Sequence, residues 1–152
     1  MPGRYGIKNV KWPSAFRLVD EPYTGFWQER GWDKDGTYKP NAFIRSPPNL
    51  ATLARGEAVT IIGTAYAGSD PVENVEITFD DGDSWQPCSF DYAPGANIWT
   101  IWRFEWVPTS RGRQRIRTRV TTAGGQVTAD DPAGTDRLAG YDSGMEVELW
   151  VS

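Results

Sequence analysis

Four residues with side-chain oxygen atoms fall within positions 80–84, inside the segment Thr-Phe-Asp-Asp-Gly-Asp-Ser-Trp that spans 78–85. This segment fits the pattern Ser/Thr-x-Asp-x-Gly-x-Ser/Thr-Trp, in which Asp80 accepts turn amides and Gly82 adopts a positive φ. The same oxygens could hold Ca²⁺, but the bidentate glutamate that closes an EF-hand loop at its twelfth position is missing. We therefore expect a β-hairpin turn with Trp85 packed under the loop, rather than a metal site.

A second feature is a row of arginines spaced two residues apart. Its members are Arg111, Arg113, Arg115, Arg117 and Arg119. In a β-strand this spacing places all five on one side, with Ile116, Thr118 and Val120 on the other. We expect a solvated sheet face whose arginines have acidic neighbours across the strands. The alternative is a charged surface for contact with another subunit or a redox partner. Phosphate-backbone binding is disfavoured because the chain has a net charge of −4.

The chain has one cysteine and no histidine, which excludes His-based zinc sites, Ser-His-Asp triads and Cys-His dyads. Cys88 has no activating neighbour in the local sequence, so we predict an inert, small core residue. Four further carboxylates lie beside prolines and glycines: Asp130, Asp131, Asp136 and Asp142. Paired carboxylates can hydrolyse glycosides, but in such loops they more often form turns. We therefore expect no catalytic residue and no metal ligand.

A chain of 152 residues has room for one domain with one hydrophobic core. A hydrophobic content of 39% with 24% charged residues is too apolar for a disordered chain. The 16 glycines and 11 prolines are scattered without a period, which is typical of a fold with many turns, and no segment has the pattern of a helix. No apolar run is long enough to span a membrane, and the N-terminus lacks the apolar core of a secretory signal.

Alternating or β-branched runs predict at least six strands, separated by Gly, Pro and Asp turns. They cover residues 59–67, 72–79, 85–90, 99–107, 113–122 and 146–151. In the fourth run, Trp102, Phe104 and Trp106 share one face. The pattern predicts an all-β fold, an immunoglobulin-like β-sandwich with an irregular N-terminal segment. A single cysteine excludes the disulfide-bearing members of that fold class.

The irregular segment covers residues 1–45 and is rich in aromatic side chains that show no steady period. A short strand could run over 16–19. The aromatic residues are otherwise expected to pack as single anchors against another surface, which points to a missing partner. Because Pro47 and Pro48 mark a linker, we predict two parts, residues 1–45 and residues 46–152.

The sequence PGRYGIKNVKW over residues 2–12 resembles the Pro-Gly-x-x-Gly-x-x-x-Val-Lys-Trp segment near the end of the molybdopterin-binding domain in sulfite-oxidase-like enzymes. The stretches DEPY at 20–23 and FWQERGW at 26–32 continue that pattern. The hairpin at 78–85, the Trp-rich run at 99–106 and VELWV at 147–151 look like the dimerisation domain that follows. The resemblance implies that 1–45 is the C-terminal tail of a molybdopterin-binding domain and 46–152 an immunoglobulin-like dimerisation domain.

In that family one pterin dithiolene and one protein cysteine hold the molybdenum, and this cysteine lies well upstream of the Val-Lys-Trp segment. The resemblance thus implies molybdenum-molybdopterin in the parent enzyme and none bound to this chain alone. Asn9, Val10 and Lys11 match a pterin-contacting stretch, where Lys11 offers an ammonium to anionic groups. Arg137 matches an arginine that can enter the oxyanion pocket. Trp32 departs from the family, since sulfite oxidases tend to have a pocket tyrosine there and an indole cannot supply a phenol proton.

These resemblances predict a non-catalytic module, inactive alone, that pairs two copies of a molybdenum oxidoreductase and contacts its molybdopterin-binding catalytic domain. Nucleic acid is not expected as a partner, and the parent enzyme is expected to be periplasmic or otherwise extracytoplasmic. The alternative is a carbohydrate-binding or adhesion sandwich, because eight tryptophans could form a sugar-stacking platform. Exposure of Trp99, Trp102 and Trp106 on one flat face would favour this alternative, and burial between the sheets would exclude it.

Overall fold

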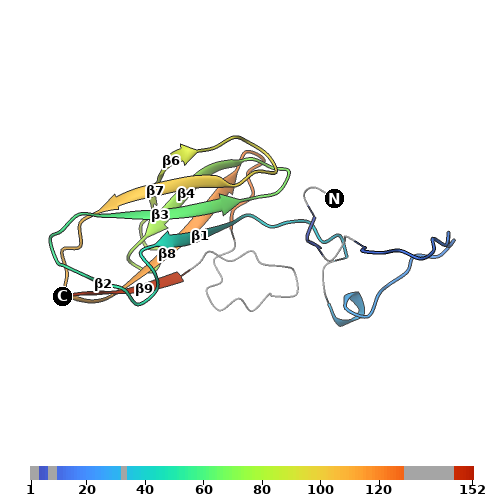
Figure 1. The fold of residues 1–152 in the computed structure, drawn as a ribbon, viewed down its shortest axis with the longest axis horizontal. Helices are drawn as coiled ribbons and strands as arrows, with labels where there is room; N and C mark the ends of the chain where they lie inside the picture. The colour runs from blue at the N-terminus through green and yellow to red at the C-terminus, as the bar shows by residue number, and fades with distance from the viewer. Residues whose placement is uncertain (1–3, 7–9, 32–33, 129–145) are drawn as a thin grey trace.

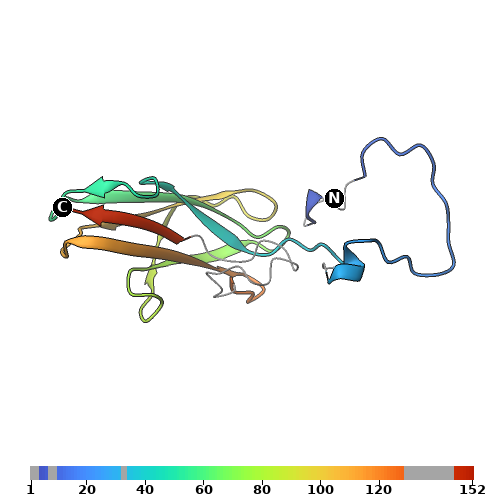
Figure 2. The same cartoon turned by 90° about the horizontal axis from the view of Figure 1, so that it is seen from below.

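The computed structural model describes residues 4–6, 10–31, 34–128 and 146–152. The strands are β1 (Asn41–Ser46), β2 (Thr52–Leu53), β3 (Val59–Tyr66), β4 (Val72–Thr78), β5 (Gln86–Pro87), β6 (Ser89–Tyr92), β7 (Thr100–Trp106), β8 (Gly112–Thr122) and β9 (Glu146–Val151). One sheet has the order β1-β3-β7-β6 and the other the order β2-β9-β8-β4-β5. The two sheets stack as a sandwich, with the N-terminal segment beyond one end and the C-terminus at the other (Figures 1 and 2). The prediction of an all-β, immunoglobulin-like sandwich is confirmed.

The long central strands form where the sequence alternates most clearly. In β8, Ile116, Thr118 and Val120 are buried while the arginines between them face outward. β8 pairs antiparallel with β4 on one side and with β9 on the other. An alternating strand forms here because one face of an antiparallel sheet can pack on a core while the other meets solvent.

The strand expected over 85–90 is in fact two short strands in different sheets. Gln86 and Pro87 pair with β4, whereas Ser89, Phe90 and Tyr92 pair with β7. The chain therefore changes sheets at Cys88. Alternation alone cannot reveal such a switch, because both short strands keep the same period while their hydrogen-bonding neighbours differ.

The sequence prediction also missed strands near the N-terminus. β1 pairs antiparallel with β3 and starts at Asn41, inside the segment read as irregular. β2 pairs parallel with β9 through only two residues. The possible strand over 16–19 is absent from the described structure, and a three-residue 3-10 helix, η2 (Gln28–Arg30), occurs where no helix was expected. The division between 1–45 and 46–152 stays a prediction, and β1 runs across that boundary.

The core lies between the sheets and has Trp102 at its centre. Trp102 is fully buried on β7 beside the buried Ile61 of β3, and Ile116 and Leu149 face them from the other sheet. Gly63 makes room for the indole, because a Cβ at that position would lie 2.0 Å from Trp102 Cζ2. The outward surfaces of the two sheets depend on this packing, since it determines which residues of each strand remain outside. No helix in the described part of the chain is long and apolar enough to cross a membrane.

Candidate functional site

Most residues that the resemblance points to are not placed by the structure. Asn9, Trp32 and Arg137 lie outside the described residues, as do the carboxylates of 130, 131, 136 and 142. Val10 and Lys11 are described and exposed, and Val10 keeps 79% of its surface accessible. Within the described ranges, no three His, Cys, Asp or Glu side chains gather closely enough to hold a metal ion. The roles assigned to Asn9, Val10 and Lys11 therefore stay predictions.

The N-terminal segment exposes large apolar side chains to solvent. Trp12, Phe16 and Leu18 are 94%, 92% and 101% exposed. Figures 1 and 2 show this part of the chain looping away from the sandwich. Such a run of exposed apolar side chains is typical of a contact surface without its partner.

An aromatic row ties the start of this segment to the four-stranded sheet. Tyr5 lies 4.6 Å from Tyr38, Tyr38 lies 4.6 Å from Tyr66 of β3, and Tyr66 lies 5.0 Å from Trp99, measured between ring centroids. The backbone supports the row, because the amide of Tyr5 donates to the Gly36 carbonyl over 2.8 Å. Offset and edge-on aromatic pairs at these distances add to the stability given by burial alone. The segment is thus anchored at both ends of its loop.

The loop from 78 to 85 closes the expected hairpin between β4 and β5. Thr78 Oγ1 donates to Asp80 Oδ1 over 2.6 Å, the amide of Ser84 donates to the same oxygen over 2.9 Å, and Gly82 has a φ of 102°. These hydrogen bonds, with that from the Ser84 hydroxyl first, lower the pKa of Asp80 to about 2. The carboxylate accepts hydrogen bonds within the turn, which confirms the expected hairpin.

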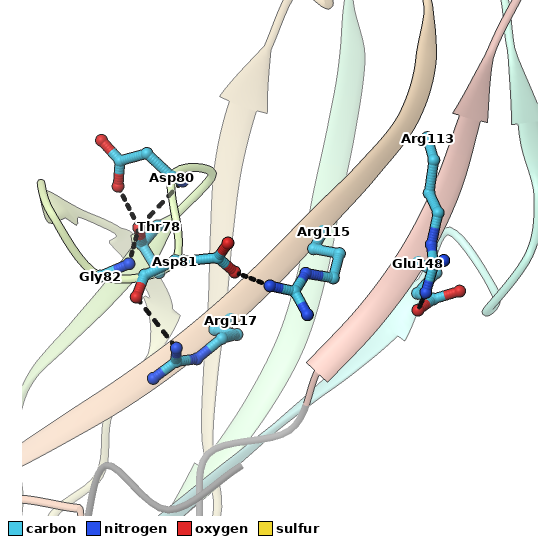
Figure 3. Close-up of polar contacts among 8 residues, drawn as sticks. All are labelled: Thr78, Asp80, Asp81, Gly82, Arg113, Arg115, Arg117 and Glu148. Atoms are coloured by element: carbon cyan, nitrogen blue, oxygen red, sulfur yellow. Dashed lines mark hydrogen bonds and ion pairs between the residues drawn. The ribbon is translucent and has the colours of Figure 1, made fainter.

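The arginines of β8 form a charged lattice on the outer face of the five-stranded sheet (Figure 3). Arg113 pairs with Glu148 of β9, Arg115 pairs with the Asp81 carboxylate, and Arg117 Nη1 donates to the Asp81 carbonyl over 3.0 Å. The Asp81 carboxylate raises the pKa of Arg115.

At the far end of the lattice, Arg119 Nε lies 2.6 Å from Glu76 Oε2, and its guanidinium stacks 4.4 Å from the Trp85 ring. Trp85 thus lies against Arg119. The acidic cross-strand neighbours that the sequence predicts are confirmed.

Cys88 lies half-buried at the point where the chain changes sheets. Burial, with a smaller contribution from the negative charge of Glu76, raises the pKa of its thiol to about 12. The thiol is therefore protonated at neutral pH and is neither a nucleophile nor a ready metal ligand, as the sequence predicts.

Trp99, Trp102 and Trp106 do not form a flat platform. Trp102 is fully buried, and Trp106 is half-buried and stacks at 4.8 Å on Phe79 inside the sandwich. Trp99 is 40% exposed and packs on Tyr66 and Phe43. Because Trp102 and Trp106 pack inside the sandwich, the structure does not favour the carbohydrate-binding alternative.

The outer face of the four-stranded sheet was not identified from the sequence as a candidate surface. We call it the β3–β7 face and define it by Thr60, Ile62, Tyr92, Ile101, Arg103 and Glu105. Its central isoleucines, Ile62 and Ile101, are 39% and 38% exposed. The available signal was the pair Ile61-Ile62 in β3, since two adjacent apolar residues in a strand point to opposite faces.

Comparison with known proteins gives three findings. A family model described as Mo-co oxidoreductase dimerisation domain matches residues 31–126. The mitochondrial sulfite oxidase of Macaca fascicularis is 27% identical over 163 aligned positions, which cover 92% of this chain and 30% of that protein. The sulfane dehydrogenase SoxCD of Paracoccus pantotrophus has a similar fold, with a TM-score of 0.64 and 15% identity over 77% of this chain and 33% of that one. The chain thus spans about a third of the length of each.

Proposed function

The chain belongs to the Mo-co oxidoreductase dimerisation domain family, and on that premise we propose that it joins two copies of a sulfite-oxidase-like molybdenum enzyme. The observation that carries the proposal is the family match over 31–126, which covers strands β1 to β8 of the sandwich. Two-fold pairing is the usual geometry of such a homodimer. The oxidoreductase activity would belong to the remainder of the parent enzyme.

The described residues do not fit a molybdenum centre. Cys88 is the chain's one cysteine, and its pKa of about 12 keeps the sulfur protonated and half-buried in the sandwich. Molybdenum-molybdopterin would accordingly be bound by the parent enzyme's cofactor domain. The chain alone is expected to have no oxidoreductase activity.

Sedimentation velocity of the 152-residue chain tests the pairing. At tens of micromolar we expect a species with twice the mass of one chain, which dissociates on dilution. A strict monomer at the highest concentration would contradict self-association of this chain.

The second part of the proposal concerns residues 10–27, which we expect to dock on the cofactor domain. Support comes from the exposure of Trp12, Phe16 and Leu18, since a stable surface rarely leaves so many large apolar side chains in water. Hydrogen exchange should be fast at these residues in the chain alone and slow in the parent enzyme. Equal exchange in both would contradict docking.

Asn9, Val10 and Lys11 would then contact the pterin, with Lys11 offering its ammonium to anionic groups of the cofactor. In the parent enzyme, Lys11→Ala should lower the pterin content, and Lys11→Arg should largely preserve it. Unchanged pterin content in Lys11→Ala would remove this role.

Arg137 and Trp32 would lie at the substrate pocket, where a guanidinium suits a tetrahedral oxyanion. In the parent enzyme, Arg137→Ala should raise KM for an oxyanion substrate more than it lowers kcat. A periplasmic or other extracytoplasmic location is part of the proposal, and signal-sequence mapping of the parent gene would test it.

A further inference from the structure

The central strands of the four-stranded sheet carry apolar residues on both faces. In β3, Ile61 points into the core with no exposed surface, and its neighbour Ile62 points outward and is 39% exposed. In β7, the core residue Trp102 follows the outward Ile101. The neighbouring outward positions of the two strands are polar: Thr60, Thr64, Arg103 and Glu105. The outward isoleucines therefore form a small apolar cluster within a polar face. Within the described chain the outward face of this sheet is covered at one end, where Tyr38 and Trp99 pack on Tyr66. It is open around Ile62 and Ile101.

The outward apolar residues lie together. Thr64 pairs with Ile101 and Ile62 pairs with Arg103 across β3 and β7, while Tyr92 of β6 pairs with Ile101. Tyr92 is itself 52% exposed. Figure 1 shows β3 and β7 at the front of the sandwich, with the N-terminal segment leading away from one end. The β3–β7 face therefore has an apolar centre that the described chain leaves open.

Positively and negatively charged side chains surround this apolar centre. Arg103 Nε lies 3.1 Å from Asp91 Oδ1, and their side chains remain 53% and 39% exposed. Thr60 Oγ1 donates to Glu105 over 2.9 Å. An apolar centre with a polar, solvent-accessible rim is the common arrangement of a protein–protein interface.

The rim is complementary to itself. Arg103 and Glu105 lie two residues apart on β7, which places their Cα atoms about 7 Å apart on the same face. In a contact with two-fold symmetry, each surface meets a copy of itself in reversed direction. Arg103 of one copy can then face Glu105 of the other, and the reverse pair forms at the same time.

The outer face of the five-stranded sheet is a weaker candidate. Its ion pairs, Arg113 with Glu148, Arg115 with Asp81 and Arg119 with Glu76, run along the whole face, whereas the β3–β7 face has the Arg103–Asp91 pair beside an apolar centre. Burying such pairs against a partner costs desolvation energy that the existing ion pairs do not return. Charged residues are depleted at the centres of interfaces for this reason.

We propose that the β3–β7 face is the surface through which two copies of this chain associate, with Ile62 and Ile101 at its centre. That the partner is a second copy of the chain rests on the proposed function. That the copies meet at this face rests on its apolar centre and self-complementary rim.

The test is Ile62→Lys, with Ile101→Lys as an independent second variant. In a dimer, each variant would place two positive charges at the proposed centre, one from each copy. We expect the dissociation constant from sedimentation velocity to rise at least about 30-fold, as for a central interface residue. Trp150→Lys is the matched control, because Trp150 is 49% exposed on the outer face of the other sheet. Far-UV circular dichroism and the thermal midpoint establish that each variant folds.

The outcomes separate this inference from the proposed function. The inference is supported if the wild type is a dimer, Ile62→Lys and Ile101→Lys dissociate it, and Trp150→Lys leaves it intact. A wild-type dimer unaffected by the two isoleucine variants overturns it while self-association stands, and the face would then be left for the catalytic domain. Dissociation by Trp150→Lys alone also overturns it and moves the contact to the five-stranded sheet. A monomeric wild type overturns the proposed self-association and the inference with it.

Discussion

Gly63 is the position where adding one carbon atom should harm the sandwich most. In Gly63→Ala the new Cβ would lie 2.0 Å from Trp102 Cζ2, 2.3 Å from Trp102 Cε2 and 2.4 Å from the Phe43 carbonyl oxygen. Two of these atoms belong to a fully buried ring, and the third belongs to the backbone of β1, which pairs with β3. Neither can move aside like the end of a flexible side chain.

Whether Gly63→Ala raises or lowers the free energy of unfolding is as informative as the size of the change. Without a clash, alanine in a strand interior would stabilise the protein by about 0.5–1 kcal/mol relative to glycine, since it restricts the unfolded chain. To restore ordinary contact, which begins at 3.4 Å, the indole must move by more than about 1 Å in a close-packed core. Overpacking of this kind typically costs 1–3 kcal/mol. We expect a cost of about 3 kcal/mol, because a backbone carbonyl blocks the second direction of relief.

Urea unfolding and thermal unfolding at a fixed chain concentration measure this cost. A loss of about 3 kcal/mol should lower Tm by about 10 °C for a domain of this size. Gly6→Ala is the control, because nothing lies within 4 Å of a Cβ there, and its unfolding should be unchanged. In a Trp102→Phe background the penalty should shrink by about 1 kcal/mol or more, because the ring that meets the Cβ is smaller. An unchanged or raised Tm in Gly63→Ala would refute the packing argument.

Three further predictions concern the polar groups of the sandwich. The pKa of Asp80 is lowered from 3.8 to about 2, so the carboxylate stabilises the folded state above pH 4 and this contribution is lost as the pH falls toward 2. Asp80→Asn should thus unfold at lower urea than wild type at pH 7, with the difference shrinking in acid. Cys88, with a thiol pKa of about 12 rather than 9.0, should react with iodoacetamide at pH 8 more than about 100-fold slower in the native protein than in urea. Arg119→Ala should lower the free energy of unfolding by about 1 kcal/mol, because it leaves the largely covered Glu76 unpaired and removes a stacking contact.

Each of these predictions has a control variant or an outcome that would contradict it. Asp83→Asn changes a neighbouring exposed carboxylate of the same loop and should leave the urea midpoint in place at either pH. Cys88 modified at the same rate in native and unfolded protein would show that burial does not protect the thiol. Arg111→Ala, at the exposed start of the arginine row, should have a smaller effect on unfolding than Arg119→Ala, and equal effects would contradict the role of Glu76.

The strands with strong alternation could be predicted from local sequence. β4, β7, β8 and β9 were found close to their observed bounds, because a strand with one buried and one solvated face must alternate. The hairpin at 78–85 was predictable for a similar reason, since Asp80 and Gly82 act through bonds and angles within the turn itself. The family resemblance also came from short stretches of sequence, and the match over 31–126 confirms it for the sandwich.

Candidate cofactor and substrate residues could be named from resemblance but not positioned. Lys11 is exposed in the described structure, and its proposed partner would lie on a different domain. A residue whose contacts are made with another part of a larger enzyme carries no local signature of that contact. The roles of Asn9, Trp32 and Arg137 therefore stay predictions.

The sequence alone determined where the chain alternates and where it turns, because those properties depend on neighbours a few residues apart. Only the tertiary structure decided that the chain changes sheets at Cys88, that Gly63 accommodates Trp102, and which of the adjacent isoleucines 61 and 62 faces out. These depend on which strands lie side by side and on which sheet stacks above, contacts between residues far apart in sequence. The β3–β7 face depends on such contacts, since Ile62 and Ile101 lie outside only because Ile61 and Trp102 pack in the core.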